Sequence, residues 1–101
     1  MTLRWLDETD DDLREIWRYV REQSDSEDRA TNVLLRIEET ATSLLSDHPF
    51  AGPVIDEDIL GRHRHLICYS FRIIYRVDDE VVIVAVIHGA RLLPAGVLRR
   101  E

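Results

Sequence analysis

The sequence predicts an α+β domain in which an N-terminal strand and an antiparallel helical hairpin pack on a mainly antiparallel four-stranded sheet. The hairpin is indicated by two consecutive segments with apolar residues at helical spacing, separated by only a few polar residues. The sheet is indicated by three β-rich runs joined by short turns in the second half. At 101 residues the chain can bury one hydrophobic core, so we expect a single domain over residues 1–101.

The first half begins with a short predicted strand, residues 2–6, which leads into a helix. Thr9 occupies the position expected of an N-cap, and the three aspartates after it suit the positive end of a helix. The apolar stripe of this helix is Leu13, Ile16, Trp17 and Val20. We expect the helix to end near Ser24, because the residues that follow are polar and break the stripe.

A second, longer helix is predicted from Ser26, which is a favourable N-cap with acids directly after it. Its apolar stripe is Ala30, Val33, Leu34, Ile37, Ala41, Leu44 and Leu45, and Pro49 prevents the helix from continuing. Two amphipathic helices with so short a connection form an antiparallel hairpin. Their stripes are interpreted as core, because packing is the first requirement of an amphipathic helix.

Residues 47–61 contain two prolines and two glycines and predict a loop. Three strands are expected after it, at residues 63–68, 71–77 and 81–88, with an acidic turn at residues 78–80. The last strand is apolar throughout from Val81 to Ile87 instead of alternating. A strand covered on both faces has this pattern, so we place it centrally in the sheet.

The composition is that of a globular protein, and no apolar run reaches the length of a membrane span. The N-terminus does not resemble a signal peptide, and the single Cys68 cannot form an internal disulfide. We therefore expect a cytoplasmic protein with a buried, inert thiol.

The charges are distributed unevenly. Residues 1–60 hold 16 acids and 6 arginines, whereas residues 61–101 hold 4 acids and 7 arginines, and the chain has no lysine. Arginine makes two-pronged contacts with carboxylates and phosphates, so the second half can receive an anionic surface. A solvated strand face is the alternative explanation. The acidic first half argues against direct binding of nucleic acid.

The apolar final strand ends abruptly at His88, Gly89 and Arg91, and two explanations remain open. In the first, Gly89 lets the backbone turn as the strand reaches solvent. In the second, the rigid strand holds His88 and Arg91 near Arg72, where clustered cations can bind an anion. The hairpin register decides part of this. A three-residue turn places His88 on the face of Arg72, and a two-residue turn places it on the opposite face.

The segments "LREIWRYV", "DHPFAG", "FRIIYRV" and "VIHGAR" resemble, in this order, the ParE/RelE superfamily of toxins from bacterial type II toxin–antitoxin pairs. The resemblance covers the chain from about Leu13 to Arg91. The "E-I-W-x-Y" helix and the "H-P-x-x-G" loop are more similar to the ParE branch than to the RelE branch. This resemblance implies a toxin that inhibits DNA gyrase by binding and is neutralised by a cognate antitoxin. No cofactor, metal or membrane contact is expected.

We expect the antitoxin or the target to contact Arg72, Arg76, Arg91, Leu98 and Arg99. Arg72 and Arg76 are placed beside a groove between the hairpin and the sheet, where they would bind an acidic stretch. The C-terminal segment is short and amphipathic, so it is expected to dock on a protein surface. Deleting residues 95–101 is predicted to abolish toxicity without unfolding the domain.

Two other functions stay open. The RelE branch implies ribosome-dependent, metal-free cleavage of messenger RNA, and the candidate catalytic residues would be Arg72, His88, Arg91, His63 and His65. That reading lacks the lysines and the C-terminal tyrosine of RelE-like enzymes. A non-toxic protein-interaction domain could be built from the same elements. Zinc binding by His63, His65 and His88 would need a further ligand.

Overall fold

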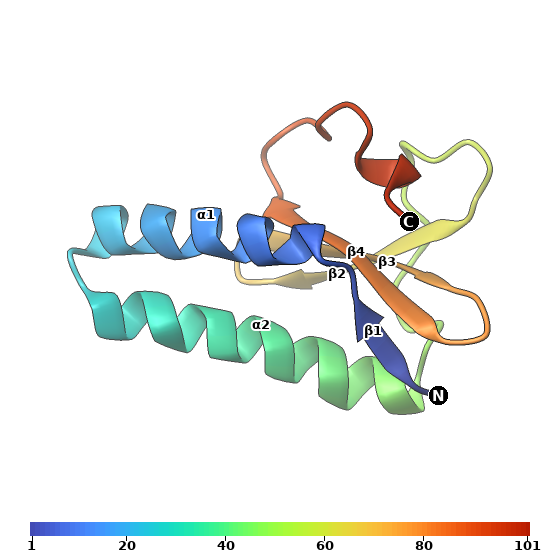
Figure 1. The fold of residues 1–101 in the computed structure, drawn as a ribbon, viewed down its shortest axis with the longest axis horizontal. Helices are drawn as coiled ribbons and strands as arrows, with labels where there is room; N and C mark the ends of the chain where they lie inside the picture. The colour runs from blue at the N-terminus through green and yellow to red at the C-terminus, as the bar shows by residue number, and fades with distance from the viewer.

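The computed structural model describes residues 1–101 and confirms the predicted order of elements (Figure 1). The strands are β1 (Leu3–Trp5), β2 (His63–Cys68), β3 (Phe71–Val77) and β4 (Val81–His88). The helices are α1 (Glu8–Ser24) and α2 (Glu27–Asp47), and a short 3-10 turn, η1 (Val97–Arg99), lies near the C-terminus. None of the helices has the length and apolar character needed to cross a membrane.

The start of α1 differs from the prediction. The helix begins at Glu8, and Thr9 is fully buried inside its first turn instead of capping it. The Thr9 hydroxyl donates a hydrogen bond of 2.6 Å to the carbonyl oxygen of Leu6. The residue therefore fastens the first turn of α1 to the end of β1. Its side chain is buried in this contact and is not used as a helix cap, although threonine favours the cap position.

The predicted cap of α2 is confirmed. The Ser26 hydroxyl accepts a hydrogen bond of 3.1 Å from the backbone N–H of Arg29, which satisfies one of the free amides at the helix start. Most of the predicted stripe is buried, except that Leu34 is half-buried and Leu44 is exposed at its margin. The indole N–H of Trp17 donates to the Thr31 hydroxyl at 3.2 Å, which links the two helices.

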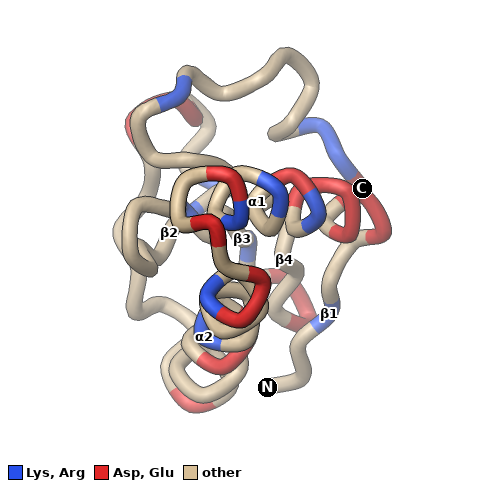
Figure 2. The backbone as a smooth tube through the Cα atoms, turned by 90° about the vertical axis from the view of Figure 1, so that its left-hand side faces the viewer, with Lys and Arg blue, Asp and Glu red and all other residues tan.

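The four strands lie in the order β1-β4-β3-β2, so β4 is an inner strand as predicted. The β2–β3 and β3–β4 pairs are antiparallel, whereas β1 runs parallel to β4 and pairs only with Val81–Ile83. The helical hairpin covers one face of this sheet, and the C-terminal segment crosses the other (Figure 1). The acidic character of the hairpin is visible as Asp and Glu along both helices (Figure 2).

Each face of the sheet has its own hydrophobic cluster. The larger one lies between the sheet and the hairpin and contains Ile16, Ile37, Tyr75 and Cys68, whose thiol is free and buried as expected. The smaller one lies under the loop and the C-terminal segment and contains Ile55, Ile74, Val82, Val84, Ala85 and Val97. Both faces of β4 are thus covered, which explains its unbroken apolar sequence.

The β3–β4 hairpin combines the two registers that the sequence left open. Val77 opposes Val81, as a three-residue turn requires, but Phe71 opposes His88, as a two-residue turn would require. The register shifts between Ile74 and Tyr75, where Val84 is the extra residue of a β-bulge in β4. His88 consequently lies on the hairpin side of the sheet, while Arg72 lies on the opposite side.

Gly89 does not provide a sharp turn at the end of β4. Its N–H donates to the Ser70 carbonyl at 2.7 Å, so the ladder continues one residue beyond the strand. A Cβ at this position would lie 3.1 Å from that carbonyl oxygen, which is tight against backbone. Gly89 therefore permits a close approach of two chains and does not require a left-handed conformation.

The C-terminal segment packs on its own domain, contrary to the expectation that its apolar side faces a partner. Val97 is buried in the smaller cluster, and Leu98 packs against it partly buried. The guanidinium of Arg100 reaches back to α1 and β4, and the Arg100 carbonyl accepts from Arg76 at 3.1 Å. The segment closes the second face of the sheet, so it is part of the fold.

Candidate functional site

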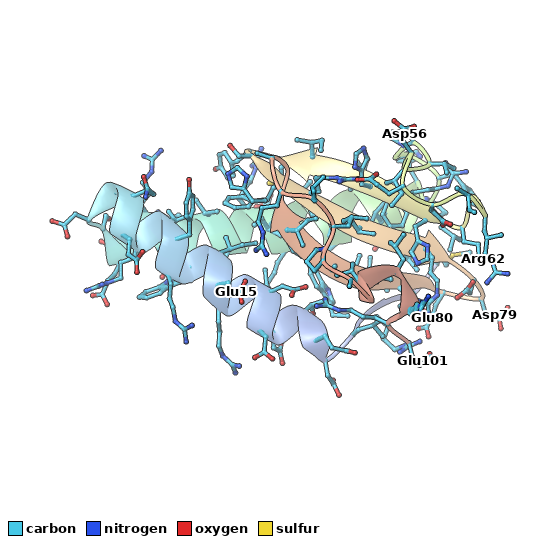
Figure 3. The ribbon with its side chains drawn as sticks, turned by 90° about the horizontal axis from the view of Figure 1, so that it is seen from above. Glu15, Asp56, Arg62, Asp79, Glu80 and Glu101 are labelled. Carbon is cyan, nitrogen blue, oxygen red and sulfur yellow. The ribbon has the colours of Figure 1, made fainter.

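A groove of about 650 Å³ runs between α1, the end of β4 and the chain that follows β4. Its walls combine charged, aromatic and aliphatic side chains: Asp12, Glu15, Ile16, Tyr19, Phe71, Val86, Ile87, His88, Arg91, Pro94 and Arg100. Glu15, labelled in Figure 3, stands on the α1 wall. The groove therefore joins residues that lie up to 88 positions apart in the sequence, namely Asp12 and Arg100.

The floor of the groove contains an open strand edge. β1 pairs with β4 only as far as Ile83, after which the chain leaves the sheet to form α1. The bond between Gly89 N–H and Ser70 C=O fixes the alternation of the ladder, so the backbone groups of Val86 and His88 point away from β3 and toward the groove. This leaves the Val86 carbonyl and the His88 N–H without a strand partner.

Two further backbone groups along this edge are satisfied locally. The Val86 N–H donates to the Asp12 carboxylate at 3.1 Å, and the Val84 carbonyl accepts from Arg100 at 3.2 Å. The Val84 carbonyl belongs to the extra residue of the bulge, whereas the Val86 N–H points away from β3 by the normal alternation of the ladder. Asp12 and Arg100 form a two-pronged ion pair at 2.7 and 3.2 Å, which closes one end of the groove.

His88 lines the groove, and its ring is held on two sides. The Phe71 and Tyr19 rings meet it edge-on, at centroid distances of 5.4 and 5.5 Å. The Ala90 N–H donates to His88 Nδ1 at 3.1 Å. Nδ1 is therefore an acceptor, and the proton of the neutral ring is on Nε2, where it can serve as a donor.

Arg91 is the cation of this groove that remains accessible. Its closest acidic neighbour is Glu15, with a nitrogen–oxygen distance of 3.8 Å between two exposed side chains. An exposed pair at this distance contributes little to stability and is easily exchanged for another partner. Both charges are thus available to a bound molecule.

A second hollow, of about 1020 Å³, continues from the groove toward the hairpin tip. The two share Tyr19, Phe71 and His88, which form the boundary between them. The second hollow adds Arg29 from α2 and the exposed Tyr69, whose backbone has a positive φ of 55° in the β2–β3 turn. The two hollows therefore adjoin at these three side chains on the hairpin side of the sheet edge.

Arg72 is not part of this groove, which corrects the expectation that it lies between hairpin and sheet. It is only 7% exposed on the opposite face and binds Glu57 through two bonds of 2.7 and 3.1 Å. Its Nε also donates to His65 Nδ1 at 2.9 Å. The hydrogen bond from Arg72 lowers the pKa of Glu57, and burial together with Arg72 lowers the pKa of His65. Arg72 holds the loop before β2 onto the sheet.

Arg76 lies on this same far face and is also engaged within the domain. It donates to Asp78 at 2.9 Å and to the Arg100 carbonyl at 3.1 Å, and Glu101 is 3.7 Å from it. Of the five predicted contact residues, Arg72 and Arg76 are therefore occupied by internal partners. Leu98 is partly buried, whereas Arg91 and Arg99 are exposed.

His63 is buried beside Asp58, with 2.7 Å between Nδ1 and the carboxylate, and its Nε2 has no partner. Burial alone would raise the pKa of Asp58. Hydrogen bonds from the His63 ring and from the backbone N–H groups of Arg62, Leu60 and His63 outweigh it and lower the pKa to about 2. As predicted, His63 and His65 share one strand face, which is the face of Arg72 and Arg76.

The candidate nuclease residues are divided between the two faces. His63, His65 and Arg72 lie under the loop and the tail, whereas His88 and Arg91 line the groove on the hairpin side. No three His, Cys, Asp or Glu side chains are grouped as metal ligands, so the histidines do not form the zinc site considered above. The structure does not bring the five residues together.

Asp12, Tyr19 and Phe71 are among the groove residues that were not marked as functional from the sequence. Tyr19 carried a weak signal, because it is a large aromatic residue three positions after Ile16, at the margin of the apolar stripe. Asp12 carried none, because it is one of three consecutive aspartates and its partner is near the other terminus.

Comparisons with known proteins agree with this architecture. A family model described as the ParE toxin of the type II toxin–antitoxin system parDE matches residues 3–93. Among solved structures, a chain from "Chromosomal ParDE TA system from P. aeruginosa" superposes with a TM-score of 0.74 and 20% identity. That match covers 87% of this chain and 95% of the other. A search of curated proteins gives no match. Since the family model covers nearly the whole domain, the chain belongs to the ParE toxin family of type II toxin–antitoxin systems.

Proposed function

We propose that this protein is a toxin that inhibits DNA gyrase by binding it in the cytoplasm, and that an extended segment of a cognate antitoxin neutralises it by occupying the groove beside α1. Membership of the ParE family supports the first part. The observation that carries the second is the open edge of β4 beside Tyr19 and His88.

The open edge suits a peptide that adds a strand to the sheet. An extended segment can donate to the Val86 carbonyl and accept from the His88 N–H, the two groups left unpaired where β1 departs. Main-chain bonds of this kind supply affinity for any sequence. Selectivity then comes from the side-chain pockets along the strand.

The side chains of the groove indicate the composition of that segment. The exposed ring of Tyr19 offers apolar surface, backed by the nearly buried Ile16 and Phe71, while His88 Nε2–H and Arg91 offer donors. Asp12 is already neutralised by Arg100, so the charges available here are Arg91 and Glu15. A segment with alternating apolar and charged residues complements this pattern, and its disorder before binding would let it adapt to the groove.

Binding, instead of chemistry, is supported by the distribution of the titratable residues. Metal-free RNA cleavage needs an acid, a base and cations around one phosphate. On one face His63 is engaged with Asp58, and Arg72 with Glu57 and His65, whereas His88 is on the other face. A groove that offers apolar surface and strand pairing is suited to binding an extended segment of another protein.

The proposed antitoxin site in the groove can be tested by peptide binding. A peptide from the C-terminus of the antitoxin encoded beside this gene is titrated into the protein by calorimetry. Replacing Tyr19 by Ser is expected to weaken binding at least about tenfold, because anchors in a groove dominate affinity. The matched control is Leu35→Ser, since Leu35 is also exposed on the hairpin but does not line the groove.

Hydrogen exchange adds a backbone readout. The His88 amide is expected to become protected on binding, while the Val86 amide, already bonded to Asp12, should change less. Unchanged affinity of Tyr19→Ser together with an unprotected His88 amide would place the antitoxin elsewhere.

A further inference from the structure

A second exposed feature lies at the end of the molecule remote from the hairpin tip. Ile59 is 96% exposed and the adjacent Leu60 is 68% exposed, in the loop that precedes β2. Single exposed aliphatic residues are common on protein surfaces and need no explanation. Here two such residues are consecutive at a loop tip, and the loop beneath them is held by a network of hydrogen bonds.

The loop is built around one largely buried carboxylate. Asp58 Oδ1 accepts from the Leu60 N–H at 3.0 Å, and Oδ2 accepts from the N–H groups of Arg62 and His63, both at 2.8 Å. The His63 ring adds a fourth bond at 2.7 Å. Gly61 adopts a positive φ of 68°, which completes the tight turn.

The consequence is a rigid turn whose internal bonds hold its backbone while its two aliphatic side chains face solvent. Fixing the backbone that carries such side chains reduces the entropy that a partner interface must otherwise overcome.

The surface beside the tip carries unpaired positive charge. Leu60 borders a hollow of about 420 Å³ whose other walls are Asp58, Arg62, His63, Arg76, Leu98, Arg99, Arg100 and Glu101. Arg76 and Arg100 are neutralised by Asp78 and Asp12. Asp58 is engaged by His63. Arg62 and Arg99 have no ion-pair partner, and Glu101 is the remaining acid of the hollow.

Arg62 projects into solvent at this end of the molecule, with Asp56 and Asp79 farther around the same end (Figure 3). The two free arginines flank the hollow, so a matching surface must place carboxylates opposite them. The groove beside α1 shares only Arg100 with this hollow.

We propose that the turn of residues 58–62, with Arg99, is the surface that binds the target protein, and that it inserts Ile59 and Leu60 into an apolar pocket rimmed by carboxylates. The inference rests on the proposed function and assigns the toxic contact to a surface separate from the antitoxin groove.

The experiment compares three variants for growth arrest when each is expressed without antitoxin, and for affinity toward the antitoxin peptide. The double substitution Ile59→Ser, Leu60→Ser removes the apolar tip. Arg62→Glu with Arg99→Glu reverses the flanking charge without touching the internal bonds of the turn. The control is Leu92→Ser, because Leu92 is 91% exposed in another loop.

Both loop variants are expected to abolish growth arrest and to lower affinity for purified gyrase at least about 30-fold, as loss of a central anchor does. Their affinity for the antitoxin peptide should stay within about threefold of wild type, and Leu92→Ser should remain toxic. Thermal unfolding checks that each variant is folded. If the Ile59→Ser, Leu60→Ser variant does not fold, the Arg62→Glu, Arg99→Glu variant alone tests the proposal.

Growth arrest by folded loop variants at the wild-type level would overturn the inference and leave the proposed function standing. Loss of arrest in both loop variants supports it even if wild type fails to bind gyrase, because the target is then another protein. A wild-type chain that causes no arrest contradicts the proposed function and, with it, this assignment.

Discussion

Asp12 and Arg100, at opposite ends of the chain, form a two-pronged ion pair of 2.7 and 3.2 Å directly over the bulge of β4. The same two side chains bind the Val84 carbonyl, which belongs to the bulged residue, and the Val86 N–H, which points away from β3. The pair therefore fastens α1, β4 and the C-terminal segment to one another. It also shapes the end of the groove.

Removing one member of this pair should destabilise the domain. Asp12→Ala leaves the Arg100 guanidinium partly buried without its partner and the Val86 amide without an acceptor, which costs about 2–4 kcal/mol of unfolding free energy. Urea denaturation measures this. Asp11→Ala, which breaks an exposed pair with Arg14, is the control and should cost less than about 1 kcal/mol. Equal effects of the two substitutions would contradict the structural role of Asp12.

Truncation of residues 95–101 should reduce stability as well as toxicity. The deletion removes Val97 from the smaller hydrophobic cluster and Arg100 from its ion pair, exposing the far face of the sheet. A lower melting temperature and a weaker near-ultraviolet circular dichroism signal are expected. If the truncated chain has the same melting temperature as the full-length protein, the tail is a separate docking segment and not part of the fold.

Arg72 should matter for the fold and not for the antitoxin. Arg72→Ala releases the loop by removing two bonds to Glu57 and one to His65. We expect a loss of stability, while affinity for the antitoxin peptide changes less than about threefold. Arg64→Ala is a comparison on the neighbouring strand, since Arg64 binds the Gly52 carbonyl of the same loop at 2.8 Å. A tenfold loss of affinity in folded Arg72→Ala would return this arginine to the interface.

Acid should weaken the turn of residues 58–62 before it unfolds the rest. The folded pKa of Asp58 is about 2, below its ordinary value of 3.8. A depressed carboxyl pKa stabilises the folded state above the unfolded value, and this contribution is lost as the pH falls from about 4 to about 2. The unfolding free energy of wild type should therefore decline in that window. Asp58→Asn should show a flatter profile, and parallel profiles would contradict the proposed role of the carboxylate.

The sequence was sufficient for the elements whose patterns are local. Ser26 capped α2 as expected, and the unbroken apolar run of β4 identified an inner strand. That same run concealed the bulge, because a strand without alternation gives no sign of which residue is extra. Thr9 was misassigned as a cap because its burial depends on β1 and is not visible in the local pattern.

The candidate site was less predictable because its contacts are long-range. Arg72 was expected to contact another protein, yet it binds Glu57 of its own chain. Glu57 lies in a segment whose sequence indicates only an acidic, irregular loop. The position of His88 depended on the bulge, which moved it to the face of Tyr19. The sequence shows which residues are charged, but it does not show which residue of opposite charge each of them binds.

The most direct test of the proposed function is a supercoiling assay with purified gyrase, the full-length protein and the antitoxin peptide. Inhibition with accumulation of cleaved DNA complexes is expected, and an equimolar amount of antitoxin should prevent it. The same preparation should leave ribosome-bound messenger RNA intact. Undisturbed supercoiling at every protein concentration, together with site-specific cuts in ribosome-bound message, would contradict a gyrase-binding toxin and identify a nuclease.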